Sequence, residues 1–180
     1  GDFYDDPGFI QAQAATLRPL LESRSWDHVL FSYHGLPESQ LRPIPGCLVD
    51  EACCDSPEGP ERRCYRAQCL RTSRALTSAL ELDEGRQSSS FQSRLTREPW
   101  IKPYTDFVLP ELHAGGIRSL LVVCPAFTAD NLETLEEVGI RLREQWEELG
   151  GEHFALAPCV NASPPFVEAV AAWARKHGGS

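Results

Sequence analysis

Two stretches of the sequence share one plan, and this repeat constrains the fold more than any other feature. "LHAGGIRSLLVVCP" and "EELGGEHFALAPC" each run from a helix end through Gly-Gly into an apolar strand that ends at Pro and Cys. Glycine suits a helix end because it adopts the left-handed backbone conformation that stops the helix. A strong amphipathic pattern over residues 131–149 separates the two copies. Helix and strand therefore alternate through this part of the chain.

The rest of the chain continues the alternation. "DHVLFSYH" and "SSSFQSRL" predict two further strands, the first apolar and buried. The four strands are expected at about 28–34, 88–94, 118–124 and 153–158. Helices are expected at 7–21, 65–82, from 105 to about 113, at 131–149 and at 164–177. Alternation with short loops favours the α/β class, a parallel sheet of about four strands with helices on both faces.

The strand ends indicate where a site should lie. Ligands of such sheets bind beyond the carboxyl ends of the strands. "FSYHGLP" places His34 at the end of the first strand, and the repeat places Cys124 and Cys159 at the ends of two others. A lone histidine is more often a packed or surface residue than a catalyst, but its place at a strand end makes His34 a candidate. The two cysteines are most simply small core residues.

An acidic run follows the third strand in "CPAFTADNLETLEE". Asp130 occupies an N-cap position, where its carboxylate lies near the positive end of the helix. Glu133 and Glu137 are four apart and share one helical face, whereas Glu136 projects to another side. The run can be an acidic first turn exposed to water. It can also be a row of oxygen donors pointing towards His34, and carboxylates with an imidazole suit a divalent cation such as Fe²⁺.

Three aromatic residues gather near the same edge of the predicted sheet. Trp100 and Tyr104 lie in "REPWIKPYTD", and Phe127 follows the Cys-Pro pair of the third strand. They can anchor loops or belong to the core. They can also form the walls of a pocket for a large flat ligand.

Three segments, "LFSYHGLP", "FQSRLTREPWIKPYTD" and "CPAFTADNLETLEE", resemble in this order the signature segments of the ferrochelatases, which insert Fe²⁺ into a porphyrin. "PCVNASPPFVEAV" is similar to the last strand-loop-helix of that family. The likeness covers nearly all 180 residues but only the second of the family's two similar α/β halves. It implies that residues 1–180 are the C-terminal domain, one half of a two-domain chelatase fold, and are inactive alone.

The resemblance also implies roles for individual residues. His34 matches the family's active-site histidine, and Glu133 matches the glutamate opposite it. The implied metal ligands are His34, Glu133, Asp130 and Glu137, and the implied porphyrin-binding residues are Trp100, Phe127 and Tyr104. Asn131 departs from the family, because Cys or His usually occupies its position, so no thiol or imidazole acts there.

The chemistry of these residues suits metal insertion. Two pyrrole N–H protons must leave while Fe²⁺ sheds its water, and an imidazole accepts protons near neutral pH. Carboxylates hold the metal or relay protons. Residue chemistry leaves open whether His34 is base or ligand, and whether the substrate is protoporphyrin IX, as expected here, or coproporphyrin. Two other functions are considered: a chelatase for another metal or tetrapyrrole, and a non-catalytic iron–sulfur sensor or interaction domain.

Five of the seven cysteines lie between residues 47 and 69. Their number suits Zn²⁺ or an iron–sulfur cluster equally, and inert thiols are the third reading. Some bacterial ferrochelatases carry an internal cysteine-rich insert that resembles the segment at about 43–64 and holds a [2Fe-2S] cluster. By that resemblance the implied ligands are Cys47, Cys53, Cys54 and Cys64, with Cys69 as a fifth candidate.

Charge and composition narrow the partners. A formal net charge of -9 argues against nucleic acid or an anionic membrane, since both attract clustered Lys and Arg. No apolar run reaches the length of a membrane-spanning helix, and the first residues lack the pattern of a signal peptide. The chain contains no Met and is expected to be a piece of something longer. We expect a cytoplasmic protein whose partners are porphyrin, ferrous iron and the missing N-terminal half.

Overall fold

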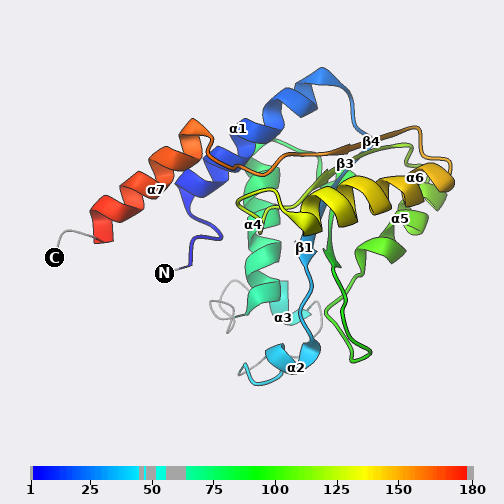
Figure 1. The fold of residues 1–180 in the computed structure, drawn as a ribbon, viewed down its shortest axis with the longest axis horizontal. Helices are drawn as coiled ribbons and strands as arrows, with labels where there is room; N and C mark the ends of the chain where they lie inside the picture. Colours follow the sequence, from blue (N-terminus) through cyan, green and yellow to red (C-terminus); the bar gives the residue numbers. More distant parts are fainter. Residues whose placement is uncertain (1, 45–46, 48–51, 56–63, 178–180) are drawn as a thin grey trace.

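The computed structural model describes residues 2–44, 47, 52–55 and 64–177. The elements in chain order are α1 (Pro7–Ser23), β1 (His28–His34), α2 (Glu38–Leu41), α3 (Ala52–Asp55), α4 (Tyr65–Ala79), η2 (Glu84–Arg86), β2 (Gln87–Gln92), α5 (Thr105–Ala114), β3 (Ser119–Val123), η3 (Glu133–Leu142), α6 (Arg143–Glu148), β4 (His153–Leu156) and α7 (Pro164–His177). Figure 1 shows the alternation of helix and strand that the sequence predicts.

The four strands form one sheet in the order β2-β1-β3-β4, and every neighbouring pair is parallel. The predicted α/β class with a parallel sheet is therefore confirmed. The β1–β2 register pairs His34 with Gln92, the last residue of each strand. Because parallel strands end at one edge, the residues that follow β1, β2 and β3 meet there.

Helices cover both faces of the sheet, as expected. On β1, Val29, Phe31 and Tyr33 belong to the core that includes residues of α1 and α4. Leu30 belongs to the core on the other face, with residues of α5, η3 and α6. The α7 helix lies beside α1 (Figure 1). Since side chains alternate along a strand, His34 projects to the face of Leu30, which is the face that η3 covers.

The helix ends of the sequence repeat have the predicted conformation. Gly116 and Gly150 have φ values of +94° and +91°, the left-handed region that glycine tolerates best. Gly151 serves a different purpose, because a Cβ there would lie 2.1 Å from Nε1 of the buried Trp146. The two Gly-Gly pairs thus turn the chain, and the second also makes room for a core tryptophan.

The segment expected to be one α-helix at 131–149 is not α-helical throughout. It begins as the π-helix η3 and becomes α-helical only at α6. A π-helix joins residues five apart by hydrogen bonds, so its side chains follow a longer period than those of an α-helix. The expected insert at 43–64 lies largely outside the described residues. Within the described part of the chain, no helix is both long and apolar enough to cross a membrane.

Candidate functional site

His34 is half-buried at the carboxyl end of β1, and its imidazole has a defined orientation. Nδ1 lies 2.6 Å from the carbonyl oxygen of Gly35. A carbonyl oxygen only accepts, so Nδ1 carries the proton and the lone pair of the neutral ring is on Nε2. The backbone around the residue is held as well, because Gly35 N–H donates to the Gln92 carbonyl at 2.8 Å. The local structure therefore presents a proton acceptor at the sheet edge.

Two of the three predicted aromatic residues flank this imidazole. The Trp100 ring centroid lies 6.5 Å from that of His34, and the Phe127 centroid lies 6.4 Å away. Trp100 is buried, and its Nε1 donates to Thr96 Oγ1 at 3.0 Å. Tyr104 is placed differently: its hydroxyl donates to the Trp100 carbonyl at 3.1 Å. Tyr104 thus supports the Trp100 loop rather than flanking His34.

A groove of about 280 Å³ opens beside His34 on the η3 side. We call it the His34 groove, and the residues that line it are His34, Ser93, Arg94, Leu95, Leu132, Glu133, Glu136, Glu137 and Arg141. The expectation that Glu136 projects to another side is wrong. Residues three and four apart are neighbours on a helix surface, so Glu136 lines the same groove as Glu133 and Glu137.

The three glutamates of the His34 groove differ in their partners. Arg141 Nε donates to Glu136 at 2.6 Å, a pair five residues apart that suits the π-helix. Glu137 accepts from the backbone N–H of Ser93 at 2.8 Å and from its hydroxyl. The Glu133 carboxylate forms no hydrogen bond or ion pair with any residue that the structure describes. Glu133 is therefore the carboxylate left available to a bound cation.

Asp130 lies apart from the other members of the predicted row. Its carboxylate accepts from Cys159 N–H at 3.0 Å and from Asn161 Nδ2 at 2.8 Å, beyond the end of β4. Burial alone would raise the pKa of Asp130, but these hydrogen bonds lower it below its ordinary value. The side-chain hydrogen bonds at the start of the helix come instead from Asn131, which exchanges them with Thr134 at 3.1 and 3.0 Å. The N-cap expected at Asp130 is thus corrected.

Gln92 and Ser93 belong to the site, although sequence reasoning missed them. The Gln92 side chain is buried, accepts from Ser32 Oγ at 2.6 Å and donates to the Glu133 carbonyl at 3.1 Å. It therefore ties the strand of His34 to the first turn of η3. The signal was present in the sequence, because "FQSR" stands at the end of a predicted strand.

The described residues contain no group of three or more His, Cys, Asp or Glu side chains arranged to hold a metal ion. For the row of His34, Glu133, Asp130 and Glu137, the reason is visible in the separate partners of Asp130 and Glu137. The row therefore does not form a closed cage in this chain. The groove therefore stays open, with one carboxylate that has no partner among the described residues.

The four cysteines of the predicted insert lie in or beside one hydrophobic core. Cys54 and Cys64 are buried in the same core, and Cys47 and Cys53 pack against it. A hydrogen bond between the Cys54 and Cys64 thiols lowers the pKa of Cys64 to about 7 and raises that of Cys54. Burial raises the pKa of Cys69 to about 12, so that thiol stays protonated. Thiols suit a metal in donor type, but among the described residues these cysteines are not arranged as a metal-binding group.

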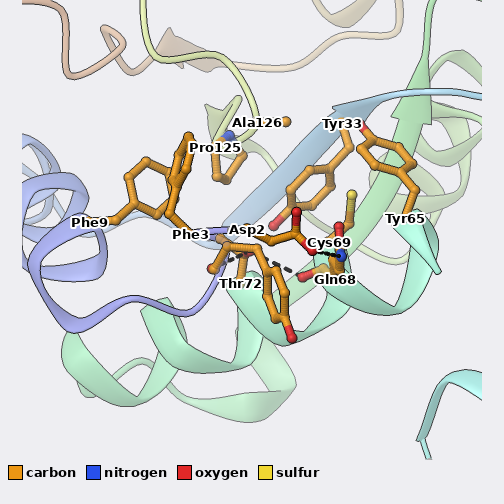
Figure 2. A pocket seen from close by; sticks show the side chains of 11 residues that line it. Asp2, Phe3, Phe9, Tyr33, Tyr65, Gln68, Cys69, Thr72, Pro125 and Ala126 are labelled. Carbon is orange, nitrogen blue, oxygen red and sulfur yellow. Dashed lines mark hydrogen bonds between the residues drawn. The ribbon is translucent and has the colours of Figure 1, made fainter. Parts of the chain in front are cut away.

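A second pocket, of about 250 Å³, lies on the other side of the β1 end. Figure 2 shows Phe3 and Phe9 on one side of it and Tyr33, Tyr65 and Cys69 on the other. Tyr65 links this pocket to the site, because its hydroxyl donates to the His34 carbonyl at 2.9 Å. The buried Cys124 and Cys159 occupy strand ends, as expected, and burial raises the pKa of both thiols.

Comparison with known proteins agrees with the resemblance. The ferrochelatase family model matches residues 1–178. Ferrochelatases of Legionella pneumophila (strain Corby) and Bdellovibrio bacteriovorus are 48% and 44% identical to the chain over 172 and 169 residues, covering 94% of the chain and 50% of each relative. The chain thus spans about half the length of these relatives. A solved CbiX protein of cobalamin biosynthesis from Marinobacter aquaeolei VT8 is 15% identical, with a TM-score of 0.48, covering 83% of this chain and 94% of that one.

Proposed function

Because the chain belongs to the ferrochelatase family, we propose that it is the C-terminal half of an enzyme that inserts Fe²⁺ into protoporphyrin IX to form haem. One observation carries the proposal: the Nε2 lone pair of His34 lies at a strand end, beside a groove that also holds the Glu133 carboxylate, which has no partner among the described residues. A base and a cation-attracting group on one groove are what metal insertion requires.

In this proposal His34 Nε2 accepts a pyrrole proton as the metal enters. Glu133 attracts Fe²⁺, the substrate, as its water is shed, because no side chain that the structure describes pairs with the carboxylate. Glu137 stays fixed by Ser93 and maintains the shape of the groove. Asp130 contributes by holding the loop after β4 against the start of η3, not as a ligand in this chain.

The macrocycle needs apolar walls, and this half supplies one side of them. Leu95 and Leu132 line the His34 groove yet are 79% and 77% exposed. Trp100 and Phe127 flank the imidazole behind them. A porphyrin seated on these side chains would remove their apolar surface from water, and that binding free energy can hold the ring bent towards the metal. The opposite wall belongs to the missing half.

The test uses the complete enzyme with protoporphyrin IX and Fe²⁺ under anaerobic conditions, and haem formation is followed by absorbance. His34→Ala should nearly abolish turnover, whereas His153→Ala, a change at an exposed histidine at the start of β4, should not. Glu133→Gln should lower kcat by at least about 100-fold, because a positioned proton-transfer or charge-stabilising group contributes that much. Equal losses in the two histidine variants would contradict the assignment of His34.

We also infer that Cys47, Cys53, Cys54 and Cys64 hold a [2Fe-2S] cluster, as the resemblance of their segment implies. Cys54 and Cys64 share one core and Cys47 and Cys53 pack against it, so cluster binding would require the four thiols to move from their described arrangement, which is not that of a metal site. A bound cluster would supply one-electron chemistry or a structural crosslink. Anaerobically purified protein should then absorb visible light and contain iron and acid-labile sulfide. Colourless protein with stoichiometric zinc would contradict this inference. A cytoplasmic location, which keeps thiols reduced, remains part of the proposal.

The alternative functions give different results in the same assay. A chelatase for another metal or tetrapyrrole would bind porphyrin but prefer another cation or ring. A non-catalytic iron–sulfur sensor would be coloured but would bind no porphyrin. Haem formation at a higher kcat/KM with Fe²⁺ than with Co²⁺ would support the proposed function over both.

A further inference from the structure

The first turn of α4 contacts two parts of the site and directly follows Cys64. The Tyr65 hydroxyl donates to the His34 carbonyl at 2.9 Å. The next side chain, Arg66, donates through Nε and Nη2 to the Lys102 carbonyl, each at 3.3 Å. Lys102 lies two residues after Trp100, in the loop whose indole flanks His34. Two consecutive side chains therefore hold the backbone of His34 and the backbone of the loop that carries Trp100.

Arg66 also reaches the cysteine-rich segment. Its Nη1 donates to Cys54 Sγ at 3.1 Å, on the opposite branch of the guanidinium from the atom that bonds Lys102. The guanidinium carbon lies 6.0 Å from the ring centroid of Phe91, the neighbour of Gln92. The side chain is only 5% exposed. Arg66 is thus enclosed between the cysteine segment, the end of β2 and the Trp100 loop.

Because the guanidinium is rigid, Arg66 can transmit a displacement of one partner to the other. Its donors lie in one plane at fixed angles, so one partner cannot move without turning the fork away from the other. Burial leaves the fork little room to turn, because close-packed interiors transmit displacements to their neighbours. A shift of the Cys54 sulfur must therefore either break its bond to Arg66 or move the Lys102 carbonyl.

We propose that Tyr65 and Arg66 are positioning residues that couple the cysteine segment to the catalytic site, so that a change at Cys54 alters the placement of His34 and the Trp100 loop and hence turnover. The part of the inference that concerns turnover rests on the proposed function, because turnover is measured as haem formation. The inference does not depend on the cluster, because a thiol, a thiolate or a metal-bound sulfur at Cys54 accepts the same hydrogen bond from Arg66.

Coupling through one residue is tested by a double-mutant cycle in the complete enzyme. Cys54→Ala removes the acceptor, and Arg66→Lys removes the fork but keeps the charge. We expect each single change to lower kcat by about 5- to 20-fold, as loss of a charge-assisted hydrogen bond would. In the Arg66→Lys background, Cys54→Ala should cost less than about 2-fold, because the link is already broken.

A matched cycle controls for general destabilisation. Arg86 donates from its guanidinium to the backbone carbonyls of Asp27 and Trp26, at the opposite end of the sheet. The effects of Arg86→Lys and Cys54→Ala should multiply, since no shared partner joins them. If the effects of Cys54→Ala and Arg66→Lys on kcat also multiply, the proposal is overturned.

Hydrogen exchange provides a readout that does not need catalysis. Gly35 N–H bonds the Gln92 carbonyl and Ile101 N–H bonds the Leu36 carbonyl, so both amides report on the placed segments. In Cys54→Ala and in Arg66→Lys these two amides should exchange at least about 10-fold faster, while Val122 in β3 stays unchanged. If the enzyme makes no haem but this pattern appears, the proposed function fails and the coupling stands. Unchanged exchange at both amides overturns the coupling.

Tyr65→Phe keeps the test decisive if the arginine variants fold poorly, because it removes only one hydroxyl. The lost bond to the His34 carbonyl should lower kcat about 3- to 10-fold with the porphyrin KM within about 2-fold. Gly35 should exchange faster as well. Tyr4→Phe, which alters another ring in the second pocket, is the matched control and should change neither quantity. Equal behaviour of the two variants would contradict a positioning role for Tyr65.

Discussion

Acid should destabilise this domain through His28, the residue at the other end of the strand that carries His34. The His28 ring is buried, its Nε2 lies 2.7 Å from Ser88 Oγ, and its exposed fraction is 6%. Burial, with help from the positive charge of Arg86, lowers the pKa of His28 from 6.5 to about 4. Between pH 6.5 and about pH 4, the His28 ring is therefore mostly protonated in the unfolded chain and mostly neutral in the folded chain.

The sign and size of the effect follow from proton linkage. The folded pKa is the lower one, so stability is full above pH 6.5, falls as pH drops through the window, and stops falling below about pH 4. With unfolded and folded pKa values of 6.5 and about 4, the free energy of unfolding drops by about 2 kcal/mol between pH 7 and pH 5 from this residue alone.

Urea denaturation of the chain at pH 7 and pH 5 measures this difference. His28→Gln removes the titrating group, so the loss between the two pH values should shrink by about 1 to 2 kcal/mol, even though the variant is less stable at pH 7. His153→Gln, at an exposed histidine in β4, should keep the wild-type pH dependence. A loss of the same size in His28→Gln and wild type would refute the reasoning. Comparing the stability loss with the loss of activity over the same pH range shows what part of the acid inactivation is caused by unfolding.

Three further results are expected. Gly35→Ala should lower turnover at least about 10-fold, because the new Cβ would lie 2.9 Å from the Gln92 carbonyl oxygen and 3.3 Å from the Trp100 ring, displacing His34; unaltered kinetics would contradict this. Gly151→Ala should destabilise the chain by about 3 kcal/mol or more in urea denaturation, since its Cβ would overlap the buried Trp146 ring. Gly116→Ala, which has open space around it but a φ of +94°, should destabilise the chain by only about 1 kcal/mol. The isolated chain should unfold cooperatively on heating but form no haem, because in the proposed function it supplies only one wall of the porphyrin site; turnover by the chain alone would contradict that.

The sequence predicted what depends on local pattern and on the rules of parallel sheets. The strand at His28–His34 and the helix at Pro164–His177 have the predicted bounds. His34 was identified as a candidate because a strand end lies at the ligand edge whatever the details of packing. Phe127 and Trp100 came to flank it for the same reason, since each follows a strand that ends at that edge.

The errors concern contacts between distant segments. Asp130 bonds Cys159 N–H and Asn161, and nothing near Asp130 in the sequence announces a partner 29 or 31 residues away. The π-helix has a similar origin. Its buried residues Thr134, Val138 and Leu142 are four apart, while the apolar Leu135 and Ile140 are 55% and 52% exposed. The apolar pattern of this segment fits both sets equally well. The packing of the helix against neighbouring elements therefore decides whether it is an α-helix or a π-helix.

The π-helical period has a consequence for charge in the His34 groove. Three carboxylates around about 280 Å³ would repel one another, and each would lose hydration where the groove is half-enclosed. The longer period lets Glu136 pair with Arg141, and the strand end lets Ser93 bond Glu137. Two of the three charges are thereby stabilised by fixed groups. The remaining one, on Glu133, has no partner among the described residues and would gain most from a divalent cation, which is why the proposed function assigns the metal to it.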